Sequence, residues 1–129
     1  MSLMKRPLRK PTDAELGILN VLWERGPSTV RQVAEALGRE AGYTTVLKLL
    51  QIMTEKGLVT RDEASRTHVY AAAFSEDQTQ RQLVSDLLER AFGGSAAKLV
   101  LQALAANRST PEELAEIRKL LDKQRGGGR

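Results

Sequence analysis

Two short amphipathic stretches, separated by only five residues, constrain this fold more than any other feature of the chain. In residues 28–38 and again in 43–57, apolar side chains recur at the spacing of one helical face, and a glycine ends each stretch. The apolar positions are Val30, Val33, Ala34 and Leu37 in the first stretch and Val46, Leu49, Leu50 and Met53 in the second. Because the connection is so short, we expect two helices that cross steeply, as in a helix-turn-helix. An ordinary pair of packed helices is the alternative.

The flanking segments extend this pair to a winged helix. Residues 12–26 predict a preceding helix, opened by a capping box from Thr12 to Glu15, with a core face of Leu16, Leu19 and Trp23. Residues 58–71 follow the second helix directly and read as two β-favouring runs around a polar tip at 63–66. We therefore expect helix, helix, helix and hairpin over residues 12–74, and a mainly α fold with a small β-hairpin wing.

The second half of the chain, residues 75–124, predicts helices throughout, with capping residues at Ser75, Ser95 and Thr110. These helices are short and make a thin core, so we expect them to form a dimerisation region that pairs with a second copy. Folding back on the winged helix within one chain is the alternative. The expected interface residues are Leu83, Leu87, Leu88, Leu99, Leu101, Leu104, Leu114, Ile117 and Leu121.

The two ends of the chain are expected to lie outside these units. Residues 1–11 predict a basic N-terminal arm, and the glycine-rich residues 125–129 predict a flexible tail. Residues 1–3 have the character of an expression scar before Met4.

Composition excludes several classes of protein. The 129 residues include no cysteine and a single histidine, His68, so disulfides, thiolate metal sites and a histidine-based metal site are not expected. No apolar run approaches the roughly 20 residues that cross a bilayer. Carboxylates are scattered on helix surfaces, with no activated nucleophile beside a base. We expect a cytoplasmic protein, not an enzyme, with no cofactor, no metal and no membrane insertion.

The charge of the chain favours an anionic partner. Net charge is +4 and the isoelectric point is about 9.7, and most of the basic surplus lies before Phe74. Arg9 and Lys10, in the basic arm, are candidates for contact with nucleic-acid phosphates. Solvated terminal residues are the alternative for both.

The second helix of the pair has the residues of a DNA-recognition helix. Thr44, Thr45 and Lys48 lie off its apolar stripe near its start, where a recognition helix places its base-reading side chains. We expect one threonine to cap the helix and the other to reach DNA, and Lys48 to donate to guanine or to a phosphate. A solvated surface lysine is the alternative.

Three further residues are candidates for contact with the DNA backbone or minor groove. Arg66, at the wing tip, is placed to enter a minor groove or hold a phosphate, although a loop arginine without a role is an alternative. Thr29 is expected to cap its helix with Gln32, which directs the positive end of that helix toward a phosphate. Tyr43 is placed either to hydrogen-bond the DNA backbone or to pack on the turn. We expect Trp23 in the core and His68 facing solvent.

Residues 12–37, 43–70 and 99–121 together resemble the penicillinase repressor and methicillin-resistance repressor family of bacterial transcription regulators. The resemblance covers nearly the whole chain and is most specific from Tyr43 through Gly57 to Tyr70. It implies a homodimeric winged-helix repressor that binds a palindromic operator of double-stranded DNA in front of resistance genes and dimerises through its C-terminal helices. The family's DNA-contacting positions match Thr44, Thr45 and Lys48, with Arg66 at the wing.

Two departures from the family's pattern bear on how repression is released. In relatives that control β-lactam resistance, a membrane sensor triggers cleavage at an Asn-Phe bond in the dimerisation region. The aligned positions here are Gln102 and Ala103, which weighs against cleavage at this bond and leaves the mode of induction open. Copper-responsive relatives carry a cysteine motif that this chain lacks. Release by a small-molecule ligand, or use of the winged helix for protein contacts only, is the alternative.

Overall fold

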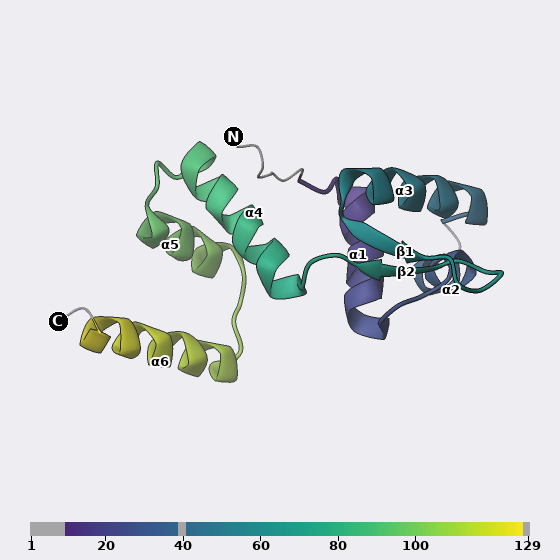
Figure 1. Cartoon of the computed structure of the whole chain (residues 1–129). Coiled ribbons are helices and arrows are strands. Elements are labelled where there is room, and N and C mark those ends of the chain that lie inside the picture. Colours follow the sequence, from purple (N-terminus) through teal and green to yellow (C-terminus); the bar gives the residue numbers. More distant parts are fainter. Residues whose placement is uncertain (1–9, 39–40, 128–129) are drawn as a thin grey trace. The chain divides into compact units, whose positions relative to one another are not determined.

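The computed structural model describes residues 10–38 and 41–127, and the chain divides into two compact units, Met1–Leu83 and Val84–Arg129. The first unit contains α1 (Asp13–Arg25), α2 (Val30–Leu37), α3 (Tyr43–Lys56), β1 (Val59–Asp62) and β2 (Val69–Ala72) (Figure 1). Helix α4 (Glu76–Ala91) begins in the first unit and ends in the second, which also contains α5 (Ala96–Ala106) and α6 (Pro111–Gly127). The predicted class, mainly α with a small hairpin, is confirmed.

Capping residues set the starts of α1 and α6 as predicted. The Thr12 hydroxyl accepts a hydrogen bond from the Glu15 N–H at 3.2 Å, and the Glu15 carboxylate accepts one from the Thr12 N–H at 2.9 Å. The same reciprocal pair forms between Thr110 and Glu113 at the start of α6. Helix α6 continues to Gly127, past the predicted end at residue 124. Residues 123–125 are good helix formers, and no proline follows to interrupt the backbone ladder.

A core of aliphatic side chains holds the first unit together. Ile18, Val33, Leu50 and Met53 are fully buried, and they come from all three helices. Burial spreads round α1 beyond the predicted face, because α2, α3 and β2 all contact this helix. Leu16 and Trp23 are only partly buried, and the Trp23 indole N–H donates to the Phe74 carbonyl at 3.0 Å.

The hairpin is fastened to the helices at its second strand. β1 and β2 pair antiparallel, with Arg61 opposite Tyr70. Tyr70 is buried and also forms a bridge with Ser28, just before α2: the Ser28 N–H donates to the Tyr70 carbonyl at 2.9 Å, and the Tyr70 N–H donates to the Ser28 carbonyl at 2.8 Å. The wing therefore has a fixed position relative to α2 within this unit.

The second unit has helices but no core of its own. None of its described side chains, residues 84–126, is buried. Large apolar side chains stand exposed along its helices, among them Leu101 at 65% and Leu121 at 59%. Such faces indicate surfaces that bind another molecule or another copy.

Candidate nucleic-acid interface

Helix α3 has one face in the core and the opposite face in solvent. Val46, Leu50 and Met53 are buried against the rest of the winged helix. Thr44, Thr45 and Lys48 are exposed. The three predicted base-reading side chains therefore project from a helix whose orientation is set by the core, which is the arrangement that major-groove readout requires.

The predicted cap by a threonine is wrong. The N-cap of α3 is Gly42, which makes no side-chain hydrogen bond, and the helix begins at Tyr43. The helix starts one residue before the threonines, so Thr44 and Thr45 both lie inside its first turn. Neither hydroxyl serves as a cap.

The exposed face of α3 also contains two residues that sequence reasoning missed. Gln51 and Glu55 are exposed and follow Thr44 and Lys48 at the spacing of one helical stripe. A glutamine amide can donate to and accept from adenine in the major groove. The apolar periodicity that defined the buried stripe also defines this opposite stripe, so the signal was present in the sequence.

Thr29 has the capping role that the sequence predicts. Its hydroxyl accepts from the Gln32 N–H at 3.2 Å, and the Gln32 side chain accepts from the Thr29 N–H at 2.9 Å. This hydroxyl therefore accepts one hydrogen bond within α2, and its O–H group can still donate. Whether the start of α2 meets a phosphate remains a prediction.

The wing has paired and unpaired charges. An Arg61 Nη2–Glu63 Oε2 ion pair spans 2.6 Å. The phenol of Tyr70 and the charge of Glu63 together raise the pKa of the Arg61 guanidinium above its ordinary value. Arg66 is exposed and has no hydrogen bond or ion pair with any described residue. His68 faces solvent as predicted.

The basic arm is described only at its end. Lys10 is exposed, directly before the first turn of α1. Arg9 lies outside the described residues, and so do residues 1–3. Both phosphate contacts stay predictions.

A buried ion pair that the sequence did not reveal fixes α3 against α1. Glu15 is 2% exposed, and both of its carboxylate oxygens accept from Lys56 Nζ at 2.9 Å. Burial alone would raise the pKa of the Glu15 carboxyl, but hydrogen bonds from Lys56 and Thr12 outweigh it and hold the pKa below its usual value. The pair joins the start of α1 to the last turn of α3, which no local sequence signal connects.

The predicted interface residues are all at least partly exposed in the single chain. Leu83, Leu88, Leu99 and Ile117 are half-buried. The others are exposed, and they are Leu87, Leu101, Leu104, Leu114 and Leu121. Gln102 and Ala103, at the position of the relatives' cleavage bond, are exposed in the middle of α5.

The described residues contain neither a candidate metal site nor a candidate membrane span. No group of three or more histidine, cysteine or carboxylate side chains among them is arranged to hold a metal ion. Within the same residues, no helix has the length and apolar character needed to cross a membrane.

Residues 11–123 match the family model described as penicillinase repressor. The chain belongs to the penicillinase repressor family. The transcriptional regulator BlaI of Mycobacterium tuberculosis (strain CDC 1551 / Oshkosh) is 34% identical over 119 residues, which are 90% of this chain and 86% of that protein. The penicillinase repressor of Bacillus licheniformis is 22% identical, over 88% of this chain and 91% of that protein. The methicillin resistance regulatory protein MecI of Staphylococcus aureus (strain N315) is 18% identical, over 88% and 94%.

The fold has a solved counterpart. The crystal structure of the YusO protein from Bacillus subtilis aligns with a TM-score of 0.50 and 19% identity, over 90% of this chain and 75% of that chain. Membership of the penicillinase repressor family makes the chain a DNA-binding transcriptional repressor of the BlaI and MecI type, a regulator and not an enzyme.

Proposed function

We propose that two copies of this chain form a homodimer that represses transcription by occupying a palindromic operator. Each protomer places α3 in the major groove of one half-site, where Thr44, Thr45 and Lys48 meet base edges. The observation that carries this proposal is the exposed face of α3, opposite a fully buried one. A twofold protein matches a twofold site, and a bound dimer excludes polymerase. The regulated genes are resistance or stress genes, as the names of the relatives suggest.

The exposed apolar faces of the second unit support dimerisation. Leu101 and Leu121 are more than half exposed in the protomer, and burying such side chains against a partner copy stabilises association by about 25 cal/mol for each Å² removed from water. Leucines rather than charged residues occupy these positions, so a second apolar face of the same kind is their natural complement. A dimer is also needed to hold two α3 helices at the spacing of two half-sites.

Contacts with the DNA backbone complete the interface. We assign these contacts to Tyr43, to Arg66 at the wing, to the start of α2 at Thr29, and to Arg9 and Lys10 in the arm. Phosphate contacts set the register of the protein on the duplex, and each one adds to the salt dependence of binding.

Release of repression follows from loss of the dimer, because one winged helix keeps only part of the contacts. A membrane sensor protease is the partner that the relatives suggest. Gln102 and Ala103 lie inside α5, so cleavage of the bond between them would require local unfolding of that helix.

The first experiment selects binding sites from random duplex DNA with the full chain, then measures affinity for the selected site by gel shift. We expect a palindromic site. Lys48→Ala lowers affinity about tenfold or more, as loss of one good base contact does. Lys119→Ala, on the exposed surface of α6, is the matched control and leaves affinity unchanged. Selection that enriches no sequence, or equal affinity of Lys48→Ala and the wild type, would contradict the assignment.

A second experiment tests the dimer. Sedimentation of the wild type at micromolar concentration should give the mass of a dimer. Leu101→Glu places a charge on the proposed interface and should give a monomer that still binds a half-site weakly. A wild type that stays monomeric at these concentrations would overturn the homodimer.

A further inference from the structure

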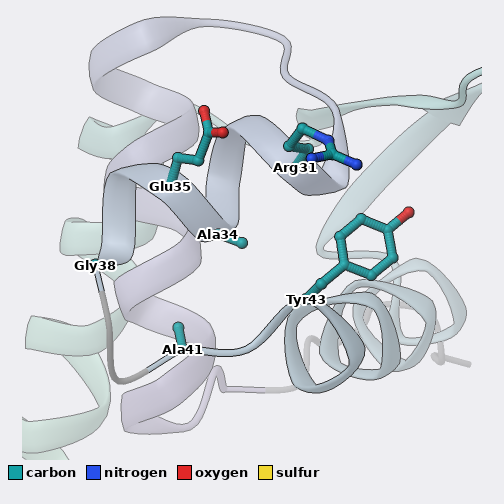
Figure 2. Close-up of a pocket in the computed structure, with 6 residues that line it drawn as sticks. All are labelled: Arg31, Ala34, Glu35, Gly38, Ala41 and Tyr43. Atoms are coloured by element: carbon teal, nitrogen blue, oxygen red, sulfur yellow. The ribbon is translucent and has the colours of Figure 1, made fainter.

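A hollow lies beside the start of α3, where Tyr43 forms part of its lining, and no role has yet been assigned to it. It measures about 440 Å³ and is lined by Arg31, Ala34, Glu35, Gly38, Ala41 and Tyr43. Arg31, Ala34 and Glu35 come from one face of α2, and Ala41 and Tyr43 come from the chain that enters α3 (Figure 2). Three of the lining residues, Ala34, Gly38 and Ala41, are small, so they leave space beside the longer side chains.

The polar groups are distributed unevenly round this hollow. Figure 2 shows the side chains of Arg31 and Tyr43 toward one end of the hollow, while the Glu35 carboxylate points away from them. Arg31 is exposed, and Tyr43 is 51% exposed. Arg31 makes no ion pair or hydrogen bond with another described residue, even with Glu35 four residues later. One end of the hollow therefore has two hydrogen-bond donors and a positive charge that no described residue pairs.

We propose that Arg31 and Tyr43 bind one backbone phosphate of the operator in this hollow. This inference rests on the proposed DNA binding and adds a site to it. A guanidinium matches the oxygens of a phosphate with two parallel hydrogen bonds, and a phenol supplies a third donor. The small side chains of Ala34 and Ala41 leave space for the sugar and phosphate to approach.

The position of the hollow relative to α3 favours a phosphate of DNA over a free anion. Tyr43 immediately precedes Thr44, so the hollow adjoins the first base-reading residue. A duplex that receives the start of α3 in its major groove brings a strand along the edge of that groove, which is where the hollow lies. The Glu35 carboxylate at the other end repels a phosphate, so the strand is held at the Arg31 end alone.

The test measures the affinity of the full chain for its selected operator across a range of salt concentrations. The slope of log K against log salt is negative, and each lost phosphate contact makes it less steep by about 0.9. Arg31→Gln should therefore make the slope less steep by about that amount for each protomer, and it should weaken binding at least tenfold near 100 mM salt. Arg118→Gln, on the exposed surface of α6, is the matched control and keeps the slope of the wild type. Tyr43→Phe removes a neutral donor, so it should weaken binding a few fold without changing the slope.

Sequence preference separates this site from base readout. Phosphate contacts have no sequence information, so Arg31→Gln should bind a series of altered operators in the same order of affinity as the wild type. Lys48→Ala should change that order. An altered order in Arg31→Gln would move Arg31 to the bases and overturn the phosphate assignment.

A neutral phosphate analogue locates the contact. We expect one position in each half-site where a methylphosphonate lowers the affinity of the wild type. At that position the same substitution should not lower the affinity of Arg31→Gln any further, because both changes remove the same interaction. If the wild type binds the operator but Arg31→Gln keeps its slope and affinity, this site is wrong and the proposed function stands. If the wild type selects no operator, both fall. Inorganic phosphate binding that depends on Arg31, with DNA affinity that does not, would assign the hollow to a free anion and overturn the proposal.

Discussion

In the winged-helix unit the apolar faces of α1, α2 and α3 meet around Ile18, Leu50 and Met53, which are fully buried, whereas none of the described side chains of residues 84–126 is buried. The local signals in the two regions are alike, because both have capping boxes and apolar stripes at helical spacing. The difference lies in what each stripe contacts. The first unit buries its stripes internally and leaves α3 free to present polar residues, and the second leaves its stripes exposed.

The largest expected effect comes from replacing one leucine by alanine in the first unit, compared with the same replacement in the second. Leu50→Ala empties a fully buried position and should lower the free energy of unfolding by about 3 kcal/mol. Leu101→Ala, at a side chain that is 65% exposed, should cost less than about 0.5 kcal/mol at protein concentrations below those at which the proposed dimer forms. Urea denaturation followed by the fluorescence of Trp23, the single tryptophan, measures the cost of Leu50→Ala, and denaturation followed by helical circular dichroism measures the cost of Leu101→Ala.

The concentration dependence of these two variants sharpens the contrast. The cost of Leu50→Ala should be the same at every protein concentration. The cost of Leu101→Ala should grow where the dimer forms, because association contributes to stability by mass action. Equal costs for both variants in the dilute protein would mean that the second unit buries Leu101 within one protomer.

The elements of the fold could be predicted because their signals are local. Capping boxes at Thr12, Thr29 and Thr110 and stop signals at Gly38 and Gly57 all act within a few residues of the helix ends they set. The start of α3 at Tyr43 matches the predicted stretch, but its cap was assigned wrongly, since Gly42 gives no side-chain signal and Thr44 gives a misleading one. The exposed positions of Thr44 and Lys48 followed directly from the buried stripe on the opposite face.

The contacts that position the interface could not be predicted, because they join distant residues. Glu15 and Lys56 are 41 residues apart, and nothing in either local segment distinguishes their ion pair from surface charges. The Ser28–Tyr70 bridge joins a loop to a strand in the same way. The hollow beside Arg31 likewise depends on how α2 approaches the start of α3, which the spacing of apolar residues leaves undetermined.

The second prediction concerns the ion pair of Glu15 and Lys56. The described residues of the second unit contain no buried ion pair of this kind. Glu15→Gln should lower the free energy of unfolding by about 2 kcal/mol at pH 7, since Lys56 would lose its charged partner in a largely dry site. Urea denaturation followed by Trp23 fluorescence measures the loss. Glu113→Gln, which changes an exposed capping glutamate of α6, is the matched control and should leave this transition unchanged. An equal loss in the two variants would show that the ion pair adds nothing to the cap.

The third prediction gives the pH dependence of that pair. The folded state holds the pKa of the Glu15 carboxyl below its ordinary value of 4.5, so the unfolded chain binds the proton first as the pH falls. The stability due to the carboxylate is therefore fully present above about pH 4.5 and is lost as the pH falls through the lowered folded pKa. The difference in unfolding free energy between the wild type and Glu15→Gln should shrink over that window. A difference that stays constant down to pH 3 would exclude the carboxylate charge as its source.

The smallest expected effect compares two equivalent caps, one in each region. Thr29→Ala should cost about 1 kcal/mol in the Trp23 transition, because α2 is part of the core and loses its cap. Thr110→Ala removes the same kind of cap from α6, where no described side chain is buried to hold the helix in place. In the dilute protein, α6 depends on local terms alone, so this change should lower helix content by circular dichroism and speed amide exchange in α6. The Trp23 transition should not move. A shift of that transition by Thr110→Ala as large as the one caused by Thr29→Ala would mean that the two units unfold together, and the contrast between an internally packed region and an open one would then fail.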